Sequence, residues 1–133
     1  MREKLSWFKN EAKKKGNSNL ASFPHPTTIV YRSFLSRLYT RDYSCQILAL
    51  RLIERRYLDA WSNAYPGKSR FRSFINHWTS SSFKNYIKNL EVASNKAFAF
   101  TKNNTFPEKV FLNVAKLEND FWDIGICHHT SFI

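Results

Sequence analysis

Glycine and proline are scarce in this chain, which has three Gly and four Pro among its 133 residues. So few turn-forming residues leave little room for an all-β fold, because short strands need many tight turns. Long apolar runs are missing as well. No stretch reaches the roughly 18 consecutive apolar residues that a membrane-spanning helix needs, so we expect no membrane partner.

Cysteine is also rare, and the features of a secreted protein are missing. Cys45 and Cys127 form no spaced pair, and the first residues contain no charged start followed by a small-residue cleavage site. We therefore expect a reduced, intracellular protein in the cytoplasm. None of the four histidines has the spacing of a metal-ligand set, so the sequence predicts no metal site.

Aromatic and basic residues, in contrast, are abundant. Aromatic residues make up 17% and hydrophobic residues 43% of the chain, enough to form the core of a single domain over residues 1–133. The net charge of +11 is compatible with a nucleic acid, an anionic lipid or an acidic partner, and equally with an ordinary solvated basic surface. Because Lys and Arg are scattered and the aromatics follow apolar stripes, the pattern disfavours nucleic acid as the partner.

Apolar periodicity predicts an all-α chain of five or six helices. Pro66-Gly67 interrupts the longest periodic segment, and Thr105 with Glu108 has the spacing of a capping box. Residues 126–133 are expected to form a frayed tail. The expected helices cover residues 2–16, 27–39, 42–65, 69–78, 83–100 and 105–125.

In the last of these helices an acid interrupts an apolar stripe. Six of the seven residues in the stripe are apolar or Gly, and the seventh is Glu118, although the same helix has a polar side. The stripe consists of Phe111, Val114, Ala115, Glu118, Phe121, Trp122 and Gly125.

The long central helix repeats this arrangement with Glu54, in a stripe of Tyr43, Ile47, Leu50, Glu54, Tyr57 and Trp61. Two buried acids ringed by aromatic residues, Trp78 among them, would form a mostly apolar cavity for a flat, hydrogen-bonding ligand. A buried carboxylate that keeps its proton can also serve as a general acid. The alternative is that each glutamate reaches solvent or pairs with a nearby Arg.

Two motifs carry a resemblance to a known family. One is "IE", two residues, "Y", three residues, "W" at Ile53–Trp61, and the other is "LE", two residues, "FWD" at Leu117–Asp123. Together with the aromatic-rich segment between them, these motifs resemble the TenA family of thiaminase II proteins, in its eukaryotic-type subgroup with Glu where other members place a catalytic Cys. The resemblance covers about residues 2–126 and matches the later part of a full family domain, so we expect an N-terminally shortened member.

The resemblance implies a partial haem-oxygenase-like helical bundle that needs no cofactor. It implies a hydrolase of thiamin salvage, which removes an amino or formylamino group from a thiamin-derived pyrimidine. In that reading Glu118 binds the aminopyrimidine and shuttles protons, Glu54 stands in the place of the catalytic Cys, and Tyr57 orients the reacting end. The residues expected to line or back the ring pocket are Trp61, Trp78, Phe121 and Trp122.

Two other functions stay open at this point. The chain could be a catalytically inactive, truncated TenA-like protein that binds or regulates, or, less favoured, a basic nucleic-acid-binding helical module. The expected partners are a small-molecule pyrimidine and, because part of the family domain would be missing, a second copy or a complementing subunit.

Overall fold

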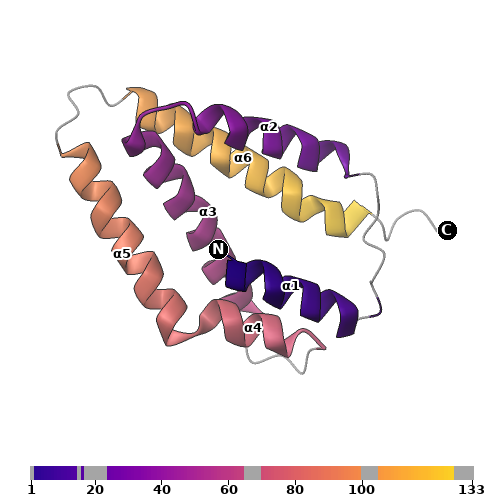
Figure 1. Ribbon diagram of the computed structural model, residues 1–133. Coiled ribbons are helices and arrows are strands. Elements are labelled where there is room, and N and C mark those ends of the chain that lie inside the picture. The colour runs from indigo at the N-terminus through magenta and orange to yellow at the C-terminus, as the bar shows by residue number, and fades with distance from the viewer. Residues whose placement is uncertain (1, 15, 17–23, 65–69, 100–104, 128–133) are drawn as a thin grey trace.

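The computed structural model describes residues 2–14, 16, 24–64, 70–99 and 105–127, and every regular element in this part of the chain is an α-helix (Figure 1). The all-α class predicted from the sequence is therefore confirmed. None of the described helices is long and apolar enough to cross a membrane. The helices are α1 (Arg2–Lys14), α2 (Pro26–Leu38), α3 (Tyr43–Asn63), α4 (Arg72–Thr79), α5 (Ser81–Phe98) and α6 (Thr105–Cys127).

Side-chain caps begin two of these helices. Ser80 is the N-cap of α5, and its hydroxyl accepts a hydrogen bond from the backbone N–H of Phe83 at 3.2 Å. His25 caps α2 in the same way, with Nδ1 accepting from the backbone N–H of Thr27 at 3.2 Å. Pro26 follows as the first helical residue, where its missing N–H costs no hydrogen bond.

The C-terminal end differs in part from the expectation. Helix α6 continues to Cys127, beyond the predicted end at Gly125. The rest of the expected tail, residues 128–133, lies outside the described residues, and so does the Thr105 side chain of the predicted capping box.

Helix α3 is the centre of the bundle. It packs against α4, α5 and α6, while α2 packs on α6. In Figure 1, α2 and α6 run along one flank of α3, and α4 and α5 form the other flank. Side chains of α3 therefore meet both flanks, and a site between the flanks has to be built around this helix.

Two apolar clusters join the flanks to α3. The first contains Cys45 and Ala49 of α3 with Val110 and Val114 of α6. The second joins α3 to α4 and α5, and its members are the buried Trp78, Phe83 and Ile87 with the partly buried Tyr57, Leu58, Trp61, Phe74 and Tyr86. The aromatic residues thus gather near the second half of α3, which contains the Ile53–Trp61 motif, and Trp122 of the α6 motif contacts Tyr57 there.

Helix α1 lies against α4 through aromatic rings and a buried acid. Trp7 stacks on His77 with 4.4 Å between the ring centroids. Glu11, 4% exposed, accepts a hydrogen bond from Ser73 Oγ at 2.9 Å and pairs with Lys14 Nζ at 2.8 Å. The hydrogen bond to Ser73 therefore joins α1 to α4, and Lys14 balances the charge of the buried acid.

The buried faces of α3 and α6 are rotated from the stripes that the spacing predicts. Tyr43 is 64% exposed and Phe111 is 50% exposed, so their predicted burial is wrong. Adjacent residues lie about 100° apart around a helix, so a small rotation of the helix buries a neighbouring row of apolar residues in place of the predicted row. The exposed members of the predicted stripes are Tyr43, Leu50, Phe111 and Ala115. The buried stripe of α6 consists of Val110, Val114, Leu117 and Glu118.

Candidate functional site

Glu118 lies in the interior, as the sequence predicts, with 3% of its surface exposed. Its Oε1 accepts a hydrogen bond from the hydroxyl of Tyr31, and its Oε2 accepts one from Nε1 of Trp122 at 2.9 Å. Each carboxylate oxygen therefore has a donor, which offsets much of the free-energy cost of burying the acid.

The two donors reach Glu118 from different helices. Trp122 lies one turn further along α6, and side chains four residues apart on a helix share a face. Tyr31 belongs to α2, which packs on α6, and its ring meets Phe121 nearly edge-on with centroids 5.9 Å apart. Local helix geometry thus supplies one donor, and tertiary packing supplies the other.

Tyr31 is a site residue that the sequence reasoning missed. The spacing of Val30, Phe34 and Leu38 predicts a buried stripe on α2 with Tyr31 beside it, but Val30 is 55% exposed and Tyr31 is 9% exposed. The signal that could have found Tyr31 is its own spacing, since it precedes Phe34 by three residues and Leu38 by seven.

The charges of both predicted acids act on Tyr57. Burial, followed by the negative charges of Glu118 and Glu54, raises the pKa of Tyr57 to about 12. The pKa of Tyr31 is raised as well, first by burial and then by its hydrogen bond to Glu118, with a smaller effect from Glu54. Glu118 contacts the Tyr31 hydroxyl directly, and the charge of Glu54 acts on both hydroxyls. Both tyrosines stay protonated at neutral pH and can donate hydrogen bonds.

The predicted aromatic residues form one connected group around this acid. Tyr57 lies 5.0 Å from Trp78 and 5.4 Å from Trp122, measured between ring centroids. Trp61 meets Trp122 edge-on at 6.4 Å. Phe121 joins the group through Tyr31, whose hydroxyl binds Glu118. Trp78 is 5% exposed, so it supports Tyr57 from behind and has little surface of its own for a ligand.

The two acids line different hollows. Glu54 lines one of about 560 Å³ between α3, α4 and α5. Tyr31, Tyr57 and Phe121 line one of about 250 Å³ between α2, α3 and α6. Glu118 lines a third, of about 260 Å³, between α3 and α6. The structure therefore brings Glu118 and most of the predicted aromatic residues together, and it leaves Glu54 at a neighbouring opening.

Glu118 differs from the other buried acid, Glu11, in the charge of its partners. Glu11 pairs with Lys14, whereas both donors to Glu118 are neutral, and no ion pair among the described residues includes Glu118. Each oxygen of a carboxylate can accept a second hydrogen bond. The arrangement thus suits a ligand that donates N–H groups. The hollow that Glu118 lines is also lined by Arg55, Arg56 and Asp59.

The raised pKa of Tyr57 predicts a loss of stability in alkaline solution. The value rises from 10.0 to about 12 on folding, so the unfolded chain gives up this proton first. The protonated Tyr57 contributes fully to the free energy of unfolding below pH 10, and this contribution is lost as the pH rises towards 12. The free energy of unfolding should fall by at most about 1.4 kcal/mol for each pH unit in this range. Urea unfolding at several pH values in this window measures the slope. Tyr57→Phe should flatten it, and an unchanged slope in that variant would contradict the assignment.

No protein-family model, curated protein or solved structure matches the chain. The resemblance to TenA proteins therefore stays a prediction from the two sequence motifs.

Proposed function

We propose that this chain is an aminopyrimidine aminohydrolase of thiamin salvage, built on a haem-oxygenase-like bundle and active in the cytoplasm. The observation that carries the proposal is the environment of Glu118. Its side chain is buried among aromatic residues, and Tyr31 and Trp122 hold both of its oxygens with neutral hydrogen bonds. An acid fixed in this way has a defined orientation and keeps lone pairs for a ligand.

The ligand that fits this environment is a flat heteroaromatic ring with amino N–H groups. An aminopyrimidine presents a ring nitrogen beside an exocyclic amine, so one oxygen of the acid can accept a hydrogen bond from the amine while the other shares a proton with the ring nitrogen. Tyr31, Tyr57 and Phe121 line the neighbouring hollow of about 250 Å³ and offer ring faces for stacking. Trp61 and Trp122 pack behind these rings and limit the movement of the acid.

The proposed reaction replaces the nitrogen on the aminomethyl carbon by water. The carbon–nitrogen bond breaks, a carbon–oxygen bond to water forms, and the products are the hydroxymethylpyrimidine and ammonia, or formamide when the substrate is formylated. Glu118 shuttles a proton at the ring and makes the aminomethyl carbon more electrophilic, and Tyr57 orients the reacting end. Glu54 lines a separate hollow between α3, α4 and α5, so its role as the group that protonates the departing nitrogen or positions the water stays a prediction.

Titration calorimetry with the hydroxymethylpyrimidine product tests for the site without requiring turnover. We expect saturable binding to one site. An analogue without the exocyclic amino group should bind at least about tenfold more weakly, because it loses a hydrogen bond to a charged group worth about 1.5–3 kcal/mol. A helical, folded chain that binds neither compound would contradict the proposal.

One observation favours a second candidate, an inactive TenA-like protein that binds or regulates. Each oxygen of Glu118 already accepts a hydrogen bond from a core side chain. A buried acid with a purely structural role would be held by the same two hydrogen bonds. In that case the product pyrimidine would bind weakly or not at all, and no substrate would be hydrolysed. The calorimetry and the ammonia assay described below therefore separate the two candidates.

A further inference from the structure

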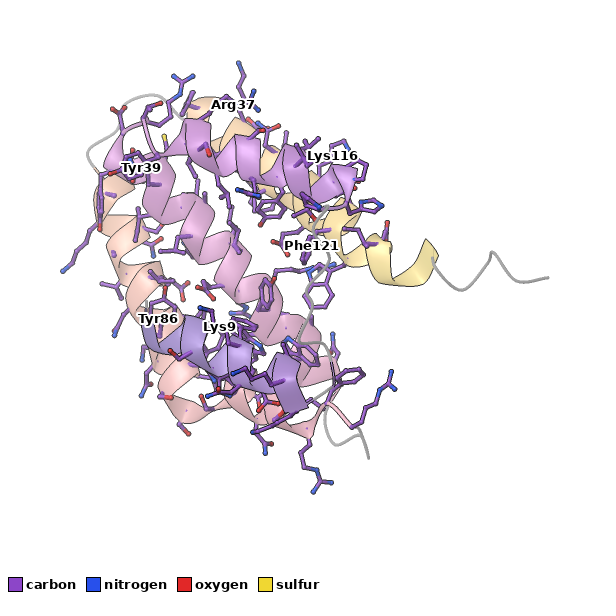
Figure 2. All side chains as sticks on the ribbon, turned by 45° about the vertical axis from the view of Figure 1, so that its right-hand side comes forward. Lys9, Arg37, Tyr39, Tyr86, Lys116 and Phe121 are labelled. Atoms are coloured by element: carbon purple, nitrogen blue, oxygen red, sulfur yellow. The ribbon has the colours of Figure 1, made fainter. Side chains whose placement is uncertain are left out.

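The turn between α2 and α3 exposes aromatic rings in an alternating pattern with arginines. Along the chain Arg37, Tyr39, Arg41 and Tyr43 follow one another at every second position. Tyr39 is 82% exposed and Tyr43 is 64% exposed, and both arginines lie at the surface. Figure 2 shows Arg37 and Tyr39 at the end of the molecule where α2 runs into α3. The expectation that the aromatics lie on core faces does not hold here.

Hydrogen bonds fix the backbone of this turn. Nε2 of Gln46 donates to the carbonyl oxygen of Tyr39 at 3.1 Å and to that of Arg41 at 2.7 Å. The hydroxyl of Thr40 donates to the carbonyl oxygen of Arg37 at 2.8 Å. The turn is thus ordered before any partner binds, which lowers the entropy lost on association.

A third ring extends the same surface. The guanidinium of Arg41 lies over the ring of Phe106, 5.6 Å from its centroid, and Phe106 is 41% exposed. The acid within the turn, Asp42, is the N-cap of α3, where the helix dipole favours negative charge. The surface formed by Arg37, Tyr39, Arg41, Tyr43 and Phe106, called the Arg–Tyr turn below, therefore combines exposed rings with a positive charge.

We propose that the Arg–Tyr turn binds single-stranded nucleic acid. Each nucleotide of a single strand offers one phosphate and one unstacked base, and the turn offers arginines for the phosphates and rings for the bases. An acidic protein would pair with the arginines but has no need of the exposed rings, and the bases of a duplex are stacked out of reach of them. The net charge of +11 supports attraction of a polyanion to this surface.

Fluorescence anisotropy with labelled oligothymidylate tests the proposal. We expect salt-dependent binding that weakens at least about fivefold in Tyr39→Ala, because stacking on one base contributes about 1–3 kcal/mol. This substitution leaves the net charge unchanged and removes an exposed side chain, so the fold should be kept. Lys88→Ala is the matched control, since it removes an exposed positive charge from α5 and should change the affinity less than Tyr39→Ala does.

The salt dependence and a competitor make the test specific. Replacing both Arg37 and Arg41 by Ala should lower the slope of log affinity against log salt by about 1.4, since each phosphate contact on a single strand contributes about 0.7. Equal affinities for the parent chain and Tyr39→Ala would overturn the proposal. Polyglutamate that displaces the oligonucleotide as well as unlabelled oligothymidylate does would also overturn it, because acidic protein would then be the better candidate.

Discussion

A Glu118→Gln variant is expected to fold and to release ammonia from an aminomethylpyrimidine at least about a hundred times more slowly than the parent chain. Folding should survive because Gln has the shape of Glu and can satisfy both neighbours. Its amide oxygen can accept from Nε1 of Trp122, and its amide nitrogen can donate to the hydroxyl of Tyr31, which then accepts. Catalysis should not survive, because an amide neither takes up nor gives up a proton near neutral pH.

The comparison needs a control for the fold and a control for charge. Circular dichroism and urea unfolding show whether the variant keeps the helices and the stability of the parent. Asp123→Asn removes a negative charge from an exposed position of α6 and should leave ammonia release unchanged. A folded Glu118→Gln variant that releases ammonia as fast as the parent would remove Glu118 from the mechanism.

Tyr31→Phe is expected to lower the free energy of unfolding by about 1.5–3 kcal/mol, as is usual for a hydrogen bond to a charged group. The Phe ring can keep the edge-on contact with Phe121, so the loss reports the hydroxyl that binds Glu118. Without it, one carboxylate oxygen is buried without its protein donor. Urea unfolding at neutral pH measures the difference.

Tyr39→Phe is the matched control for this measurement. It removes the same hydroxyl from the C-cap of the same helix, where the side chain is 82% exposed, and should change stability by less than about 0.5 kcal/mol. Equal changes in the two variants would mean that the hydrogen bond from Tyr31 to Glu118 does not help to hold the bundle together.

Helix positions were predictable from the sequence, but the buried face of each helix was predictable only in part. Periodic spacing and breakers such as Pro66-Gly67 define where a helix lies, because they act locally. The buried face depends on which helix packs against it, and aromatic-rich helices offer two adjacent apolar rows. On α2 the row through Tyr31 is buried in place of the row through Val30, and for this reason the sequence did not reveal one of the two hydrogen-bond donors to Glu118.

The buried acids show the same limit. Glu118 was recognisable from the sequence as a candidate buried acid, because it lies in the apolar stripe of a helix that has a separate polar side. Glu11 was not, since it lies in a stretch of Lys and Asn and becomes buried only when α1 packs against Ser73 of α4. Spacing also could not place Glu54 and Glu118 at separate hollows, because the distance between two helices is a property of the packed bundle.

Ammonia release shows whether Glu118 is an acid that acts on a ligand. Release from an aminomethylpyrimidine of the thiamin type should be measured for the parent chain and for Glu118→Gln side by side, with the hydroxymethylpyrimidine identified as the second product. We expect sustained release by the parent and its loss in the variant. No release by a folded, helical parent chain would contradict this role and would make Glu118 a structural acid held by Tyr31 and Trp122.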